Sequence, residues 1–223
     1  MQELAAIFHG VPFLHAFGIS IAIALVAYLF GCMNGAVIVS KYFLRDDIRT
    51  HGSGNAGLTN FYRTFGGPFT FLVIAVDVLK MLIAVWLGLL IFSVLQIAPS
   101  VMVKYWAGLF CMLGHMFPCM FHFHGGKGIL SGGTLVFLLD WKIAAVAWGV
   151  FLVVSAATRL VSLGSCCTAF TLPIMSALTY HSILVTIFSC CIGGLILWQH
   201  RGNIRRIFKG KESKFYFHRK KAQ

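Results

Sequence analysis

Charged residues are scarce in this chain, and acidic ones most of all. Asp, Glu, Lys and Arg together make up 11% of the 223 residues, whereas a soluble domain carries about a quarter. Only 6 residues are acidic against 18 Lys and Arg, so the formal net charge is +12. With 59% hydrophobic residues, the composition excludes an ordinary soluble enzyme. It predicts an all-α, polytopic membrane helix bundle.

Proline is also rare, and paired cysteine motifs are absent. There are 5 Pro against 23 Gly, a balance typical of closely packed membrane helices. The 7 cysteines lie in apolar stretches without a Cys-x-x-Cys pair, so they predict packing residues and not a zinc or redox site. His115, His122 and His124 have no carboxylate or cysteine nearby in ligand spacing. We therefore expect no metal and no other cofactor.

Runs free of Asp, Glu, Lys and Arg predict seven transmembrane helices in a single domain over residues 1–223. In chain order the helices are 13–38, 69–103, 105–126, 128–139, 143–158 and two within 160–200. The second extends the uncharged run 81–103 by residues 69–80, which include Asp77 and Lys80. The break between the last two belongs near 179–182, and residues before Pro12 are expected at the membrane interface. The fourth covers only about 18 Å of a roughly 30 Å hydrocarbon core, so six full spans is the alternative.

The placement of Lys and Arg predicts the orientation of the bundle. With the N-terminus outside and the C-terminus cytoplasmic, all but three of the 18 Lys and Arg fall on the cytoplasmic side, within 40–68, 121–127, 158–162 and 200–223. Half of them lie in the basic tail over 200–223, which an anionic membrane surface attracts by about 1 kcal/mol per charge. The net charge therefore indicates membrane lipids as partners and no nucleic acid. The same orientation puts the candidate motifs on one side of the membrane, where they can converge into one site.

The first candidate motif lies in the loop over 41–63. It gathers three glycines, two asparagines, Ser53 and Thr59 within 52–60, and such a stretch can adopt positive φ and turn its backbone N–H groups towards a phosphate. Arg49 and Arg63 flank it and are suited to clamp that phosphate. Asp46 and Asp47 are expected to hold the arginines in place. The alternative is a flexible connector.

The second motif is Gly125-Gly126-Lys127-Gly128, at the start of the fourth hydrophobic run. It is not a Walker A loop, because Phe121 stands where the first glycine is required and no Ser or Thr follows the lysine. Glycine amides and an ammonium at the start of a helix still make an anion site. The alternative is a tight turn whose lysine reaches the membrane interface.

Two further motifs combine cations with small polar residues. Their members are Arg159, Ser162 and Ser165 in a short turn, and His200, Asn203, Arg206 and Glu212 in the tail. Ser162 and Ser165 share a helix face and either bind phosphate or cap the helix. Glu212 is expected to pair with a neighbouring cation. The alternative for the tail motif is a polybasic surface segment.

Asp77 and Lys80 stand three residues apart within the second predicted span. This spacing places them on one helix face, where they are expected to form an ion pair. An unpaired charge there costs on the order of 3 kcal/mol at the bilayer centre. We therefore expect Asp77 and Lys80 to support the candidate site.

In this order, the motifs resemble those of the bacterial membrane glycerol-3-phosphate acyltransferases that use acyl phosphate as donor, the PlsY family. The likeness covers nearly the whole chain, although Leu58 and Ile129-Leu130-Ser131 depart from the family pattern. It rests on Asp47-Ile48-Arg49, Gly52-Ser53-Gly54-Asn55, Thr59-Asn60, Arg63, Gly66, Asp77, Lys80, His115, Phe117-Pro118, Gly125-Gly126-Lys127-Gly128, Thr158-Arg159, Ser162-Leu163, Ser165, His200, Asn203-Ile204, Arg206, Gly210 and Glu212.

The resemblance implies transfer of a fatty acyl group from acyl phosphate to the 1-hydroxyl of glycerol 3-phosphate, giving 1-acylglycerol 3-phosphate (lysophosphatidic acid) and phosphate. It implies phospholipid biosynthesis in the bacterial cytoplasmic (inner) membrane, with the active site facing the cytoplasm and an upstream enzyme that forms acyl phosphate. A membrane transporter or a lipid-binding scaffold for a phosphorylated metabolite is the alternative class.

The resemblance also assigns roles to residues. Arg49, Lys127 and His200 are implied as catalytic. The implied phosphate-binding residues are Ser53, Gly54, Asn55, Gly57, Thr59, Asn60, Arg63, Gly125, Gly126, Gly128, Arg159, Ser162, Ser165, Asn203 and Arg206. Asp47, Asp77, Lys80, His115 and Glu212 are expected to support them.

The general base stays open among three candidates. They are His200, His115 and the donor's own phosphate, whose pKa lies near 6. Substrate-assisted proton transfer to the phosphate is the favoured version, as the resemblance implies.

Overall fold

The computed structural model describes residues 12–95 and 99–215. Over these ranges the chain is helical and has no strand, which confirms the predicted all-α class. The chain divides into two compact units, with the boundary between Asp140 and Trp141, and each unit is described by itself. The single domain over 1–223 stays a prediction. The expected interfacial segment before Pro12 and the end of the basic tail, from 216 on, lie outside the described residues.

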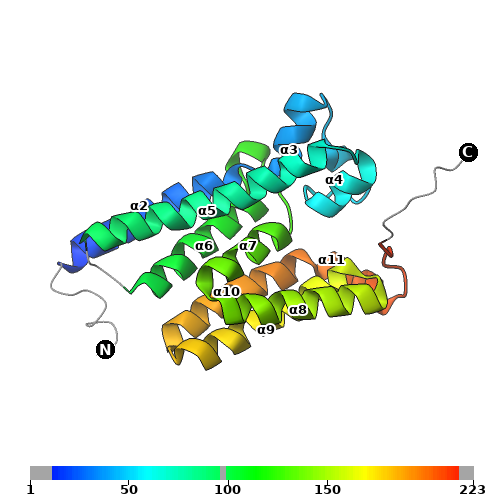
Figure 1. Cartoon of the computed structure of the whole chain (residues 1–223). Coiled ribbons are helices and arrows are strands. Elements are labelled where there is room, and N and C mark those ends of the chain that lie inside the picture. The colour runs from blue at the N-terminus through cyan, green and yellow to red at the C-terminus, as the bar shows by residue number, and fades with distance from the viewer. Residues whose placement is uncertain (1–11, 96–98, 216–223) are drawn as a thin grey trace, which may run out of the picture. The chain divides into compact units, whose positions relative to one another are not determined.

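The first unit is built on three long helices, α2 (Phe13–Cys32), α5 (Phe69–Leu95) and α6 (Ser100–Met116). Figure 1 shows these helices lying side by side, and each packs against the other two. α2 and α6 approach closely because Gly31 and Gly114 have no side chain: a Cβ on either would overlap a backbone carbonyl of the partner helix.

Shorter elements of the first unit carry its loops. They are α3 (Gly35–Ile38), the π-helical turn Val39–Phe43, the 3₁₀ turn Ile48–Thr50, α4 (Leu58–Thr64), the 3₁₀ turn Cys119–Phe121 and α7 (Ile129–Leu139).

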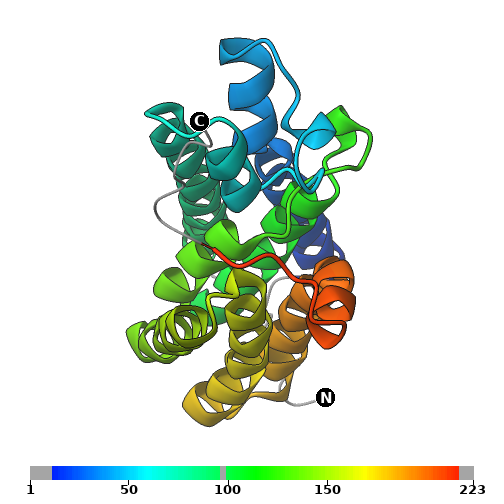
Figure 2. The same ribbon diagram turned by 90° about the vertical axis from the view of Figure 1, so that its right-hand side faces the viewer.

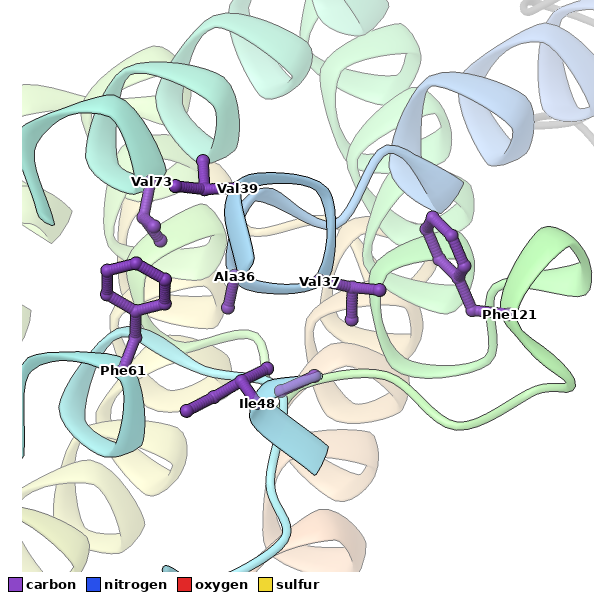
Figure 3. Close-up of a cluster of buried hydrophobic side chains, with 8 residues drawn as sticks. Ala36, Val37, Val39, Ile48, Phe61, Val73 and Phe121 are labelled. Atoms are coloured by element: carbon purple, nitrogen blue, oxygen red, sulfur yellow. The ribbon is translucent and has the colours of Figure 1, made fainter. Parts of the chain in front are cut away.

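A buried apolar cluster joins the loops of the first unit to its helices. It contains Ala36, Val37, Val39, Ile48, Ala56, Phe61, Val73 and Phe121. Figure 3 shows Phe61, Ile48 and Phe121 reaching this cluster from three separate segments of the chain. Burying such side chains contributes about 1.5–3 kcal/mol each. The cluster therefore holds the loops over 44–61 and 117–128 against α3 and α5.

The second unit contains α8 (Trp141–Thr158), α9 (Val161–Tyr180), α10 (Ile183–Gln199) and α11 (Arg201–Phe208). α9 packs against both α8 and α10, and Figure 2 shows α11 continuing from α10 in a new direction. The bend between α10 and α11 is 59°.

Pro173 lies inside α9. It has no N–H, so the carbonyl of Ala169, four residues earlier, loses its helical donor. Gly193 of α10 lies against that carbonyl, because a Cβ on Gly193 would stand 2.5 Å from it. The glycine thus lets α10 approach the interrupted turn of α9.

Each of the seven predicted hydrophobic segments contains a helix of 11 residues or more, but not all are long enough to span. Four helices have the length and composition of a membrane span: 14–32, 69–94, 141–158 and 161–180. The bent pair 183–199 and 201–208 is a fifth candidate. α7 has 11 residues and covers only about 16 Å, so the predicted fourth segment is short. The predicted break near 179–182 is also confirmed, since α9 ends at Tyr180 and α10 begins at Ile183.

Three predicted segments have wrong boundaries. The first segment is not continuous over 13–38, because α2 ends at Cys32 and Asn34 starts α3 by accepting a hydrogen bond from the Val37 amide at 3.0 Å. The second does not extend to 103, because α5 ends at Leu95 and residues from Ser100 on belong to α6. The third begins at Ser100, after Pro99, and its helix ends at Met116. The residue before Pro118 is disfavoured in α-helical conformation, so 117–126 form a loop and not the end of a span.

Candidate functional site

Asn60 organises the first candidate loop. Its side-chain Nδ2 lies 3.0 Å from the carbonyl of His51 and 3.1 Å from that of Asn55, and its Oδ1 accepts from the amide of Ser53 at 3.1 Å. Gly52 and Gly54 take the positive φ expected of this stretch. Because Asn60 is buried and uses both ends of its amide within the loop, it fixes the loop's shape.

Several backbone N–H groups of the two glycine-rich loops donate hydrogen bonds within the protein. The amides of Ser53, Gly54 and Gly57 donate to Asn60 Oδ1, the His51 carbonyl and the Asn55 carbonyl. Those of Gly125 and Gly126 donate to the carbonyls of Met116 and His115 at 3.2 and 3.1 Å. Each of these five amides therefore already has a protein acceptor, and its expected part in cradling a phosphate stays a prediction. Phosphate binding by the other groups of these loops stays a prediction.

Arg49 joins the two loops. Its Nε and Nη2 donate to the Asp47 carboxylate at 3.0 and 2.8 Å, and its Nη1 donates to the Phe121 carbonyl at 2.8 Å. The prediction that Asp47 holds an arginine is confirmed. Asp46, by contrast, pairs with His51 at 2.9 Å and not with an arginine, because His51 lies on the same turn of the loop.

The contact between Asp47 and Arg49 shifts the pKa of both side chains. Hydrogen bonding from Arg49 lowers the pKa of the Asp47 carboxyl to about 2, and the same pairing raises the pKa of Arg49. Since the pKa of Asp47 is depressed in the folded state, its stabilising contribution is present at neutral pH and is lost as the pH falls from about 4 towards 2. Arg49 thus keeps its charge and its orientation throughout the physiological range.

Gly126 is the point where the second loop meets the first. A Cβ added there would overlap Nε2 of His115 and stand 2.5 Å from the carbonyl of Ala56. That carbonyl also accepts from Asn34 Nδ2 at 3.0 Å. Only glycine fits between these two groups, so Lys127 follows from a fixed position. As predicted, the motif precedes a helix: Gly128, with φ of 76°, is the N-cap of α7.

Gly126→Ala is expected to destabilise the first unit by about 1–3 kcal/mol, because the extra methyl group has no room. Thermal unfolding of the purified protein in detergent measures the effect. Gly149→Ala is the matched control: it lies in α8 with nothing within 4 Å of the added Cβ and should leave the melting temperature unchanged or slightly higher. Equal melting temperatures for the two variants would contradict the assignment.

Asp77 and Lys80 form the predicted ion pair. Lys80 Nζ lies 2.7 Å from Asp77 Oδ1, and both side chains are about 1% exposed. Nζ also donates to the Met33 carbonyl at 3.1 Å and contacts Nδ1 of His115 at 2.7 Å. Since an ammonium only donates, Nδ1 accepts and the His115 proton lies on Nε2. The pair thus supports the α2–α3 break and the histidine beside Gly126.

Asn34 and Phe121 are site-supporting residues that the sequence analysis missed. Asn34 links the α2–α3 break to the first loop through the Ala56 carbonyl, and a buried amide inside a long apolar run is the signal that marks it. Phe121 offers its carbonyl to Arg49, and its ring lies about 6 Å from the charged groups of Arg49 and Lys41. No local pattern indicates such a backbone acceptor.

In the second unit, three side chains converge on Glu212. Ser162 Oγ and Asn203 Nδ2 donate to Oε1 at 2.7 and 2.6 Å, and Arg206 Nε donates to Oε2 at 2.7 Å. The predicted pairing of Glu212 with a cation is confirmed. Burial raises the pKa of Glu212, but the three hydrogen bonds outweigh it, so the pKa lies below its usual value. Glu212 therefore ties the start of α9 to α11 as a carboxylate.

The remaining predicted residues of this unit lie close to the same elements. His200, at the junction of α10 and α11, is buried, and its Nδ1 donates to the Ile196 carbonyl at 2.8 Å. Ser165 Oγ donates to the carbonyl of Val161 at 2.8 Å, as a helix hydroxyl commonly does. The Arg159 carbonyl accepts from the amide of Phe215 at 2.8 Å. The substrate-binding roles of these residues stay predictions.

Two predicted residues of the first unit, Thr59 and Arg63, lie on α4. Their substrate-binding roles stay predictions.

Comparisons with known proteins identify relatives over most of the chain. The family model for glycerol-3-phosphate acyltransferase matches residues 21–210. A glycerol-3-phosphate acyltransferase of Thermoanaerobacter pseudethanolicus is 38% identical over 191 residues, covering 86% of this chain and 93% of the relative. One from Pseudomonas aeruginosa (strain LESB58) is 36% identical over 201 residues, covering 86% and 98%.

Two solved structures have the same fold. Both are crystal structures of PlsY (YgiH), an integral membrane glycerol 3-phosphate acyltransferase, in its glycerol 3-phosphate and lysophosphatidic acid forms. The first matches with a TM-score of 0.79 and 30% identity, covering 88% of this chain and 96% of the other; the second matches with a TM-score of 0.76 and 30% identity, covering 88% and 95%. The chain belongs to the glycerol-3-phosphate acyltransferase family.

Proposed function

We propose that this protein transfers a fatty acyl group from an acyl phosphate to the 1-hydroxyl of glycerol 3-phosphate, releasing 1-acylglycerol 3-phosphate and phosphate. The observation that carries the proposal is the family match over residues 21–210. A structural relative is named in a form with glycerol 3-phosphate and in one with lysophosphatidic acid, which supports this acceptor and this product. An acyl phosphate must come from a reaction that forms it, so an upstream acyl-phosphate-forming enzyme is the expected partner.

In this reaction the main task of the protein is to position two anionic substrates, the acyl phosphate and glycerol 3-phosphate. An acyl phosphate is a mixed anhydride with an activated carbonyl and a good leaving group, so rate enhancement comes from orientation and from stabilising charge on the tetrahedral carbon's oxygen. Arg49 is suited to this task because Asp47 and the Phe121 carbonyl fix its guanidinium. Lys127 adds an ammonium on a loop fixed at Gly126. We assign both to the substrate phosphates.

The Glu212 cluster supplies the second set of groups. Glu212 orients the side chains of Asn203 and Arg206. We assign these two side chains, with Arg159, to substrate phosphate. The carboxylate then acts as a positioning group and not as a base, since three donors already satisfy it.

Proton transfer from the glycerol hydroxyl is assigned to the donor's own phosphate, with His200 as the alternative base. The Ile196 carbonyl only accepts, so the proton of the neutral His200 ring lies on Nδ1 and Nε2 is its basic atom. Substrate assistance requires no protein group with a pKa near 7, because the phosphate's own pKa lies near 6.

His200→Gln is expected to lower kcat by less than about tenfold if the phosphate is the base, because a lost protein base costs about 10²–10⁴-fold. Steady-state kinetics of the purified variant measure it. His200→Asn, which keeps a side-chain donor near the Ile196 carbonyl, separates loss of the base from loss of that bond. A drop of the larger size in both variants would assign the base to His200.

We infer a membrane topology of seven spans with a short fourth, the N-terminus outside and the C-terminus cytoplasmic. The distribution of Lys and Arg supports this orientation. We infer that the active site then faces the cytoplasm, in the bacterial inner membrane. A C-terminal reporter that is active only in the cytoplasm tests it: an inactive reporter on a full-length, membrane-inserted fusion contradicts the orientation.

The decisive experiment for the donor uses purified protein in lipid with palmitoyl phosphate and glycerol 3-phosphate. Phosphate release should require both substrates, and 1-acylglycerol 3-phosphate should appear in equal amount. Palmitoyl-CoA replaces palmitoyl phosphate in the matched control and should give no acylated product. Equal product from the two donors rejects the donor assignment, and no product from either rejects the acyltransferase.

A further inference from the structure

Two cysteines of the first unit come together although they lie 87 residues apart in the chain. Cys32 is the last residue of α2, and Cys119 is the first residue of the 3₁₀ turn Cys119–Phe121. Their Sγ atoms are 3.8 Å apart. Cys32 is buried and Cys119 is exposed. The sequence analysis expected only packing roles for the cysteines, because no local motif pairs these two.

The fold holds the two thiols in place on both sides. Gly31 and Gly114 let α2 and α6 approach to backbone contact, and this fixes the end of α2 against the last turns of α6. Tyr28 Oη then donates to the Phe117 carbonyl at 2.7 Å, one turn before Cys32 and two residues before Cys119. Helix packing therefore already holds the two cysteines together, so a disulfide between them requires no further loop-closure entropy.

We propose that Cys32 and Cys119 are a redox modification site that forms a reversible disulfide under peroxide. The exposed Cys119 thiolate attacks a peroxide oxygen and breaks the O–O bond, giving a sulfenic acid and, after protonation, water. The Cys32 thiol then attacks the Cys119 sulfur, forms the S–S bond and releases a second water. Two thiols and one hydrogen peroxide thus give one disulfide and two waters. Thiol–disulfide exchange with a cellular thiol reverses the step.

Oxidation changes the support of Arg49. A disulfide bond is about 2.05 Å long, so the two sulfurs must approach by a further ~1.8 Å. Cys119 starts the short turn that ends at Phe121, whose carbonyl accepts from Arg49 at 2.8 Å. Pulling that turn towards the end of α2 moves the acceptor, and Arg49 then loses part of its fixed orientation. The disulfide is therefore expected to lower acyl transfer, and this consequence rests on the proposed function.

The test uses the full-length protein in phosphatidylcholine–phosphatidylglycerol nanodiscs, treated with hydrogen peroxide. Remaining thiols are then blocked with N-ethylmaleimide, and mass spectrometry under non-reducing conditions maps the peptides. The expected result is a Cys32–Cys119 linked peptide that dithiothreitol abolishes. Cys32→Ser and Cys119→Ser should each remove it, whereas Cys190→Ser, at an exposed cysteine of α10, should not. Recovery of Cys32 and Cys119 as separate thiols or higher oxides overturns the proposal.

Activity measured on the same samples tests the consequence. Peroxide should reduce phosphate release by the wild-type protein, dithiothreitol should restore it, and Cys32→Ser should keep its own rate through both treatments. A linked peptide with an unchanged rate overturns the regulatory part. Absence of acyl transfer before oxidation concerns the proposed function alone, since the linked peptide is read without any substrate.

Discussion

Lys127→Ala is expected to reduce kcat/KM for glycerol 3-phosphate by about 10²–10³-fold, the usual cost of removing one fixed group that stabilises developing charge. The reason is geometric. The amides just before the lysine are bound to the carbonyls of Met116 and His115, and α7 begins just after it. The ammonium therefore starts from a fixed point, and water cannot replace it at equal strength.

Controls separate charge from position in this experiment. Lys127→Arg keeps the charge but replaces a compact ammonium by a planar fork, so a partial loss is expected. Lys142→Ala removes another lysine close to a helix start, in the first turn of α8, and should leave the kinetics unchanged. A Lys127→Ala enzyme with wild-type kcat/KM would remove Lys127 from the site, even if the family assignment stands.

Breaking the buried Asp77–Lys80 pair is expected to cost about 3–5 kcal/mol of stability, because either single change leaves a buried partner uncompensated. Asp77→Leu and Lys80→Met should each lower the melting temperature in detergent strongly. The double variant should lie above both single variants, since it buries no lone charge. It should not fully recover, because Lys80 also donates to the Met33 carbonyl and Asp77 accepts from the Gly35 amide at 3.1 Å.

An exposed ion pair of the same unit provides the comparison. Asp46 and His51 are 2.9 Å apart, but their side chains are about 40% exposed. Exposed pairs contribute little because water screens them, so Asp46→Asn should hardly change the melting temperature. If Asp77→Leu were equally harmless, the buried cluster would not hold the α2–α3 break, and another contact would have to explain it.

Helix positions follow from the sequence because hydrophobic runs and interrupting residues are local signals. The break at His181 and Ser182 and the short α7 were predicted from such runs. The end of α2 was not, because Cys32 and Met33 are as apolar as their neighbours. That helix stops where Asn34 caps the next one and Lys80, far along the chain, takes up the Met33 carbonyl. A tertiary contact decides the boundary.

At the candidate site, too, charge pairs between residues close in the chain could be predicted, whereas the folding of the loop backbone could not. The pairs Asp47–Arg49 and Arg206–Glu212 are short-range and could be predicted from charge and spacing. The direction of the loop amides could not, since it depends on Asn60 folding back onto the carbonyls of His51 and Asn55. Glycine-rich composition indicates that a loop can turn its N–H groups outward, but not that it does so. The anion site is therefore assigned to side chains more than to backbone.

The link between Glu212 and α9 has a consequence for encounter rates. Together with the bond from the Phe215 amide to the Arg159 carbonyl, it keeps Lys209, Lys211 and Lys214 near one end of the second unit instead of letting them diffuse on a free tail. Both proposed substrates are anions, so a stationary positive field attracts them over a Debye length of roughly 10 Å. Added salt should then slow substrate capture at low concentration while leaving turnover at saturation unaffected.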